Sequence, residues 1–143
     1  MILVSACLLG ENCKYNGGNN DNACVKAYLE GKEYIAVCPE VLGGLKSPRD
    51  PAEIRGGRVV LKNGTDVTEA FTAGAEKVLQ TAKQTGATLA ILKEASPSCG
   101  RNLIYDGTFS GTKIKGCGLT VQALLKEGIL VKSEQDLEKE QNI

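Results

Sequence analysis

Three short apolar segments, each leading into a cysteine, constrain the fold of this chain more than any other feature. They are residues 2–5 with Cys7, residues 34–37 with Cys38, and residues 88–92 with Cys99. Segments of this length are too short for helices, and the turn-forming residues that follow them are typical of strand ends. The chain therefore predicts three strands that each deliver one cysteine at or just beyond the carboxyl end.

Helical patterns separate these strands, and further short elements follow. Helices are expected at 23–30, 66–85, 119–126 and 134–140, and a fourth strand at 129–131. Asp66 and Glu69 have the spacing of a capping box at the start of the second helix. Residues 54–55 and 58–61 are joined by Gly56-Gly57 and predict a β-hairpin, residues 103–105 are expected to be extended, and residues 38–51 are expected to form an irregular loop.

The order of these elements predicts the fold class. Continuous apolar strands that alternate with helices indicate a parallel sheet that is covered on both faces. We expect a single α/β domain over residues 1–143, with a mostly parallel sheet of about four strands, flanking helices and one small hairpin. Ligands of such sheets bind beyond the carboxyl ends of the strands. Cys7, Cys38 and Cys99 are all expected at that edge.

Composition narrows the chemistry that this edge can support. The chain has six cysteines and no histidine, so zinc sites with histidine ligands and nucleophiles paired with histidine are excluded. Its 17 basic residues are balanced by 17 acidic ones, so neither nucleic acid nor a membrane is an expected partner. The amino terminus lacks the pattern of a signal peptide, and we expect a cytoplasmic protein. In that compartment cysteines indicate metal binding or catalysis rather than disulfides.

Three thiolates around one point favour an iron-sulfur cluster that has one open iron. The short spacing of many cluster motifs is absent, so this interpretation depends on the fold. A zinc site or a non-catalytic sulfur carrier is the alternative, with Cys13 or Cys117 as the fourth ligand. A thiol redox pair of Cys7 and Cys13 is a weaker alternative, because its spacing differs from the two-residue redox motif. Cys24 is expected to point from its helix toward the sheet.

Polar residues beside the predicted ligands are candidates for the chemistry. Glu40 follows Cys38 by two residues and is a candidate acid or base, with pairing to Arg49 as the structural alternative. The hydroxyls of Ser96 and Ser98 are expected to orient a substrate, or to cap their loop. Gly43 and Gly44 would let the backbone approach a flat ligand, or would serve as turn residues.

The motifs that surround these residues resemble the bacterial 2-thiouracil desulfurase family, long catalogued as a domain of unknown function. The resemblance covers nearly the whole chain in order. It is carried by Ser5-Ala6-Cys7-Leu8-Leu9-Gly10, Cys13-Lys14-Tyr15-Asn16-Gly17, Cys38-Pro39-Glu40-Val41-Leu42-Gly43-Gly44, Ser47-Pro48-Arg49, Lys93-Glu94-Ala95-Ser96-Pro97-Ser98-Cys99-Gly100 and Ile104-Tyr105-Asp106-Gly107-Thr108-Phe109-Ser110-Gly111.

The resemblance implies a 4Fe-4S cluster and a small thiolated pyrimidine as substrate. It implies that Cys7, Cys38 and Cys99 hold the cluster, that the open iron takes the substrate sulfur, and that water supplies the oxygen of the product. The family's catalytic residues fall on Glu40 and Ser96, which implies proton transfer and substrate positioning. Relatives usually have an acidic residue where this chain has Cys117, which suggests an additional thiol near the site or a different substrate within the family.

Overall fold

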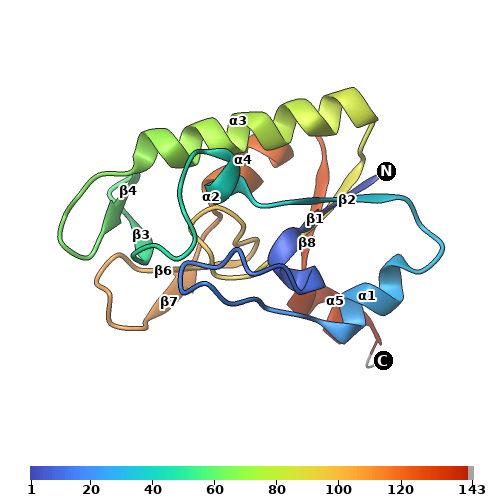
Figure 1. Ribbon diagram of the computed structural model, residues 1–143, viewed down its shortest axis with the longest axis horizontal. Coiled ribbons are helices and arrows are strands. Elements are labelled where there is room, and N and C mark those ends of the chain that lie inside the picture. Colours follow the sequence, from blue (N-terminus) through green and yellow to red (C-terminus); the bar gives the residue numbers. More distant parts are fainter. Residues whose placement is uncertain (142–143) are drawn as a thin grey trace.

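A four-stranded parallel sheet runs through the middle of the molecule (Figure 1). The structure is a computed structural model that describes residues 1–141. The strands follow the order β2-β1-β5-β8, and every neighbouring pair is parallel. Their bounds are β1 (Ile2–Ser5), β2 (Tyr34–Val37), β5 (Leu89–Leu92) and β8 (Leu130–Ser133). The predicted α/β class and parallel sheet are confirmed.

Helices cover both faces of this sheet. They are α1 (Ala23–Leu29), α2 (Pro39–Leu42), α3 (Thr68–Thr85), α4 (Leu119–Lys126) and α5 (Glu134–Gln141), with a 3-10 helix η1 (Ala6–Leu9). Leu3 and Ala90 pack in one core with side chains of α3 and α4. Val4 and Ile91, the next residues along the same strands, pack in a second core with side chains of α1 and α5. This alternation arises because successive side chains of a strand point to opposite faces.

The terminal helix α5 docks through one apolar side chain. Leu137 is the only large aliphatic residue between positions 134 and 141, and it is 1% exposed in the core with Val25 and Leu29 of α1. At the other end of α1, the Asn22 side chain accepts a hydrogen bond from Val25 N at 3.0 Å and caps the helix. Leu137 therefore docks α5 against α1, and a 3.0 Å hydrogen bond from the Asn22 side chain to Glu138 also joins these helices.

Two small antiparallel hairpins lie at one end of the sheet (Figure 1). The first joins β3 (Ala52–Arg55) to β4 (Arg58–Leu61) through the predicted Gly56-Gly57 turn. The second joins β6 (Leu103–Tyr105) to β7 (Lys113–Lys115), and the sequence predicted only its first strand. All three residues of β7 are exposed, so this strand leaves no hydrophobic signal in the sequence.

Other local predictions differ from the structure. The expected irregular loop at 38–51 contains helix α2, which begins at Pro39 because proline suits the first turn of a helix. The predicted capping box is wrong: Val67 is the N-cap of α3 and has no side-chain cap bond. Asp66 instead accepts a hydrogen bond from Thr68 N at 2.8 Å and pairs with Arg58. Strand β8 spans 130–133 rather than 129–131.

Helix α2 packs on α3 through two glycines. A Cβ atom at Gly43 would lie 1.9 Å from the carbonyl oxygen of Ala70, and a Cβ atom at Gly74 would lie 1.9 Å from that of Pro39. Such separations are far below van der Waals contact, so only glycine permits this approach. The packing fixes the short helix that carries Glu40.

The glycine contact predicts a specific stability loss. Gly43→Ala should lower the free energy of unfolding by about 1–3 kcal/mol, because the new methyl group meets backbone rather than a movable side chain. The measurement is denaturant unfolding followed by circular dichroism. Gly31→Ala is the control: its φ of 75° strains alanine, whereas the φ of Gly43 is −77°, but no atom lies within 4 Å of the Gly31 Cβ position. A smaller loss at Gly43 than at Gly31 would contradict the packing role.

Within residues 1–141, no helix combines the length and the apolar character that crossing a lipid bilayer requires.

Candidate functional site

The three strand-end cysteines open onto one cavity at the carboxyl edge of the sheet. The cavity has a volume of about 350 Å³, which lies within the range of small-molecule sites. Cys7 sits in η1 directly after β1, Cys38 is the N-cap of α2 directly after β2, and Cys99 lies in the loop that follows β5. All six cysteines lie within the described residues and carry free thiols. The predicted convergence of these three side chains is thus observed.

A buried carboxylate holds the loop that carries Cys99. The Glu94 side chain is turned away from solvent, with 2% of the residue exposed. Its Oε1 atom accepts hydrogen bonds from the backbone N–H groups of Arg101, Asn102 and Leu103 at 2.8, 2.9 and 3.0 Å. Its Oε2 atom accepts one from the Asn102 side chain at 2.9 Å. The carboxylate therefore closes the segment 94–103 into a fixed turn.

Hydrogen bonding also sets the pKa of this carboxyl group. Burial alone would raise the pKa of Glu94, but the bonds from Leu103 and Asn102 favour the charged form and keep the pKa below its usual range. A second carboxylate supports the same loop. Glu134 accepts a hydrogen bond from Glu94 N at 2.6 Å, and its own pKa is raised, mainly by burial.

The hydroxyl of Ser96 organises the next residues. It accepts hydrogen bonds from the backbone N–H groups of Ser98 and Cys99, each at 3.1 Å. Ala95, just before it, has a φ of 70°, which is strained for a residue other than glycine. The hydrogen bonds of Glu94 and Ser96 on either side hold this strained backbone in place. The loop therefore presents Ser96 and Cys99 to the cavity in a fixed relation.

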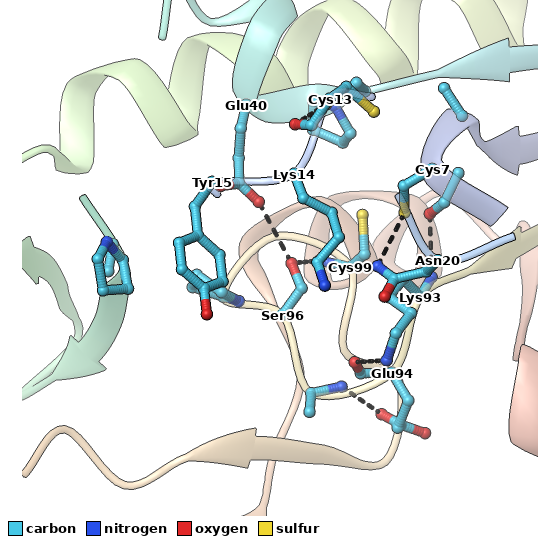
Figure 2. Close-up of a pocket in the computed structure, with 18 of the residues that line it drawn as sticks. Cys7, Cys13, Lys14, Tyr15, Asn20, Glu40, Lys93, Glu94, Ser96 and Cys99 are labelled. Carbon is cyan, nitrogen blue, oxygen red and sulfur yellow. Dashed lines mark hydrogen bonds between the residues drawn. The ribbon is translucent and has the colours of Figure 1, made fainter. Parts of the chain in front are cut away.

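Glu40 faces this loop from the opposite wall (Figure 2). Its Oε1 atom accepts hydrogen bonds from the Arg49 guanidinium at 3.1 and 3.2 Å. Its Oε2 atom lies 2.9 Å from the Ser98 hydroxyl and 3.4 Å from that of Ser96. The hydroxyls of Ser96 and Ser98 are themselves 2.9 Å apart. Glu40 therefore makes both of the contacts that the sequence suggested. One carboxylate oxygen pairs with Arg49, and the other faces the hydroxyls of Ser96 and Ser98.

The cavity also contains a fourth thiol, that of Cys13. Hydrogen bonds link it to both Cys7 and Cys38; they lower the pKa of Cys7, and they lower that of Cys38 to about 7. The same two contacts raise the pKa of Cys13 itself. Burial raises the pKa of Cys99 to about 12. The four thiols therefore differ in how readily they form the thiolates that bind metals.

Two other cysteines lie away from the cavity. Cys117 packs partly against the core beneath α3 and α4, and its Sγ atom donates a hydrogen bond to Arg101 O at 3.2 Å. The expectation that it adds a thiol near the site is therefore not met. Cys24 packs partly against the core on the other face of the sheet, and its Sγ atom donates to Gln141 at 3.0 Å.

Three predicted substrate-contacting residues have other positions in the structure. Ser98 is fully buried behind Ser96, where it contacts Glu40 rather than the open cavity. Gly43 is the packing residue between α2 and α3, and Gly44, with a φ of 97°, forms the turn after α2. Gly44 therefore has the turn role that the sequence offered as its alternative, whereas Gly43 packs α2 against α3.

Several residues of the cavity wall were not identified from the sequence. Lys14 and Tyr15 come from the loop that carries Cys13, whereas Tyr105 and Lys113 come from the β6–β7 hairpin. The Lys113 ammonium lies 5.7 Å from the centre of the Tyr105 ring. Lys14 and Tyr15 follow Cys13 directly, so their position could have been inferred from the cysteine. Lys113 carried no such signal, because its strand was not predicted.

The donor set fits an iron-sulfur cluster better than a single metal ion. The cavity supplies sulfur from several strand ends, which is the donor that such clusters require. Within residues 1–141, no three cysteine or carboxylate side chains are placed to hold one metal ion. A cluster of several irons spans a wider gap between its ligands.

The fold and the cavity together define an α/β protein with a sulfur-lined site at the carboxyl edge of its sheet. A family model described as 2-thiouracil desulfurase matches residues 2–136. The chain belongs to this family and is a desulfurase, an enzyme that cleaves C–S bonds.

Two relatives extend over nearly the whole chain. The "Uncharacterized protein YbbK" of Bacillus subtilis (strain 168) is 46% identical over 147 residues, which cover 96% of this chain and 97% of that protein. The solved structure of the "[4Fe-4S]-dependent thiouracil desulfidase TudS (DUF523Vcz)" is 45% identical and superposes with a TM-score of 0.90. That match covers 96% of this chain and 93% of the other. The predicted family is confirmed.

The hydrogen bonds of Glu94 predict a pH-dependent contribution to stability. Glu94→Gln should lower the free energy of unfolding by about 2 kcal/mol at pH 7, because the charged acceptor is lost. Folding lowers the pKa of Glu94, so its charged carboxylate stabilises the protein at pH values above the usual glutamate pKa. This stabilisation disappears as the pH falls through the pKa that Glu94 has in the folded protein. The difference between the two proteins should therefore shrink from pH 7 to pH 3 in denaturant titrations. Glu76→Gln, at an exposed position of α3, serves as the control. If the difference in unfolding free energy between wild type and Glu94→Gln stayed constant with pH, the role of the charge would be contradicted.

The thiol pKa values predict an order of alkylation in metal-free, reduced protein. Cys38 should react with iodoacetamide well before Cys99 at pH 7, as measured by peptide mass spectrometry. Its rate should rise roughly tenfold between pH 6 and pH 8, because the thiolate fraction rises through that range. In Cys13→Ala the profile of Cys38 should move to higher pH, since the main hydrogen bond that lowers its pKa is removed. An unchanged profile would show that Cys13 does not act on Cys38.

Proposed function

We propose that this chain removes the sulfur of a thiolated pyrimidine, such as 2-thiouracil, by hydrolysis at a 4Fe-4S cluster held by Cys7, Cys38 and Cys99. The observation that carries the proposal is the meeting of Glu40 and Ser96 with these three thiols in one cavity. Family membership and the likeness to a solved [4Fe-4S]-dependent desulfidase support it. The absence of histidine from the sequence leaves Glu40 as the candidate proton acceptor.

The overall reaction exchanges sulfur for oxygen without a change of oxidation state. A thiocarbonyl group and one water molecule give a carbonyl group and hydrogen sulfide, so no electron donor or acceptor is required. The bound cluster would supply an iron without a cysteine ligand, which acts as a Lewis acid toward sulfur. The protein must then place the substrate, activate the water and transfer protons.

Glu40 is suited to the proton transfers. Arg49 holds one carboxylate oxygen, which leaves the other directed at the serine hydroxyls and the cavity. In this geometry Oε2 accepts a proton from water as the water attacks the carbon of the thiocarbonyl group. Ser98 donates to the same oxygen and lies beside Ser96, so the hydroxyls extend the carboxylate's reach along the wall.

Ser96 and the residues at the mouth of the cavity are suited to substrate placement. The Ser96 hydroxyl is fixed by two backbone N–H groups and lies between Glu40 and the Cys99 loop. Tyr15, which is 44% exposed, and Tyr105 provide aromatic surface at the cavity. Base–aromatic stacking commonly orients a planar pyrimidine. These residues would direct the thiocarbonyl group toward the three cysteines.

The test is anaerobic reconstitution followed by assays of iron and sulfide. Wild-type protein should hold about four irons per chain and release sulfide from 2-thiouracil. Glu40→Gln should keep the cluster absorbance and lose roughly 100-fold or more of the sulfide release, since a general base is removed. Glu69→Gln, an exposed glutamate on α3, is the matched control. Full activity in Glu40→Gln would refute its role.

Replacement of the predicted ligands separates this function from its alternatives. Cys99→Ala should reduce both iron content and sulfide release, whereas retention of the full cluster would remove Cys99 from the ligand set. One zinc per chain and no iron in protein purified without oxygen would favour a structural metal site. Bound cluster without sulfide release from any thiolated pyrimidine would favour a sulfur carrier.

A further inference from the structure

One side-chain amide points at the sulfur of a proposed cluster ligand. The Nδ2 atom of Asn20 donates a hydrogen bond to Cys7 Sγ at 3.4 Å (Figure 2). Sulfur is larger than oxygen, so such a bond is longer than the roughly 3 Å of an N–H···O bond. Both residues line the cavity at the carboxyl edge of the sheet. The amide is therefore part of the surroundings of the proposed cluster.

The backbone also holds Asn20 beside Cys7. Asn20 N donates a hydrogen bond to Cys7 O at 2.9 Å, and Asn22 N donates one to Leu8 O at 2.9 Å. Residues 20–22 are thus paired with η1, and the side chain of Asn22 caps α1 directly afterwards. Asn20 is bonded to Cys7 through its backbone as well as through its side chain. The amide therefore has a fixed position at the sulfur.

A role in shaping the loop does not account for the Asn20 side chain. The side-chain oxygens of Asn16, Asn19 and Asn22 each accept a backbone N–H, at 2.9, 3.0 and 3.0 Å, and so stabilise turns or the start of α1. The side chain of Asn20 makes no such bond within residues 1–141. Its one hydrogen bond to those residues goes to the Cys7 sulfur.

The other two proposed ligands lack a comparable donor. Ser98 Oγ lies 3.5 Å from Cys99 Sγ, but it is 2.9 Å from Glu40 Oε2, and a hydroxyl has only one proton to donate. Cys38 Sγ contacts the carbonyl oxygen of Cys13 at 3.9 Å, and a carbonyl group donates no proton. In the part of the chain that the structure describes, Asn20 is thus the one side chain whose N–H is directed at a proposed ligand sulfur.

We propose that Asn20 is a positioning residue for the cluster: its side-chain amide directs the Cys7 sulfur and draws electron density from it. The proposal rests on the function proposed above, because it requires Cys7 to be a cluster ligand. Hydrogen bonds to the sulfurs are among the features that set the reduction potential of an iron-sulfur cluster. A donated hydrogen bond stabilises the additional negative charge of the reduced cluster, so it raises the potential. The same loss of electron density from the sulfur makes the iron a stronger Lewis acid.

The test detects the hydrogen bond directly in reconstituted protein whose asparagines carry ¹⁵N in the side-chain amide. After reduction of the cluster with dithionite, pulsed EPR of wild type should show a hyperfine coupling to an amide nitrogen, because an N–H···S bond transfers spin density. Asn20→Leu, of similar size but without a donor, should lose this coupling. Asn19→Leu, at the exposed neighbouring position, is the matched control and should keep it.

The reduction potential and the retention of iron supply further readouts. All of these proteins should take up the same amount of iron. The potential of Asn20→Leu should be more negative than that of wild type, whereas Asn19→Leu should match wild type. A chelator should remove iron roughly tenfold faster from Asn20→Leu, because the ligand is no longer held by an outer partner. Asn20→Ala, which brings no larger group toward the cluster, should behave in the same way and replaces Asn20→Leu if leucine disturbs folding.

A wild-type spectrum without the amide coupling, or a coupling that persists in Asn20→Leu, would overturn the proposal. Equal reduction potentials in wild type, Asn20→Leu and Asn20→Ala would also overturn it. These measurements need no substrate and are therefore separate from sulfide release. Failure of wild type to release sulfide from 2-thiouracil would refute the proposed function alone, and wild-type protein that takes up no cluster would refute both.

Discussion

The buried carboxylate of Glu94 is the interaction on which the site most depends. Three consecutive backbone N–H groups and one side-chain amide converge on it, and this turns the chain back immediately after β5. Without a charged acceptor at that point, these donors would be buried without partners, at a cost of about 1–3 kcal/mol each. The positions of Ser96 and Cys99 follow from this turn. A buried charge thereby determines the shape of the cavity wall.

The structural position of Glu40 is suited to the chemical role proposed for it. Arg49 occupies one oxygen and fixes the orientation of the side chain, and the other oxygen remains at the cavity wall beside two hydroxyls. The short helix that carries Glu40 is held in turn by the glycine contact between α2 and α3. The proposed base, Glu40, is therefore positioned from two directions, by an ion pair and by backbone packing.

The sequence predicted the parts of the structure that burial controls. Apolar strands and their terminal cysteines were correctly identified because a parallel sheet leaves continuous hydrophobic runs. Strand β7 was missed because all its residues are exposed, and α2 was missed because a helix of four residues, the first of them a proline, carries no helical periodicity. The anchoring role of Glu94 and the distance of Cys117 from the cavity depend on tertiary contacts that no local pattern records. The roles of the proposed ligands and of Glu40 and Ser96 remain predictions.

The spacing of the three strand-end cysteines along the chain has a consequence for assembly. They follow β1, β2 and β5, which are adjacent in the sheet but belong to distant parts of the sequence. A cofactor bound by such a set has no preformed site in the unfolded chain, so its binding free energy would add directly to the stability of the native state. Loading would come after the sheet has formed, and the loaded protein would be held together by a covalent link across three strands. Cofactor occupancy would then report on folding itself.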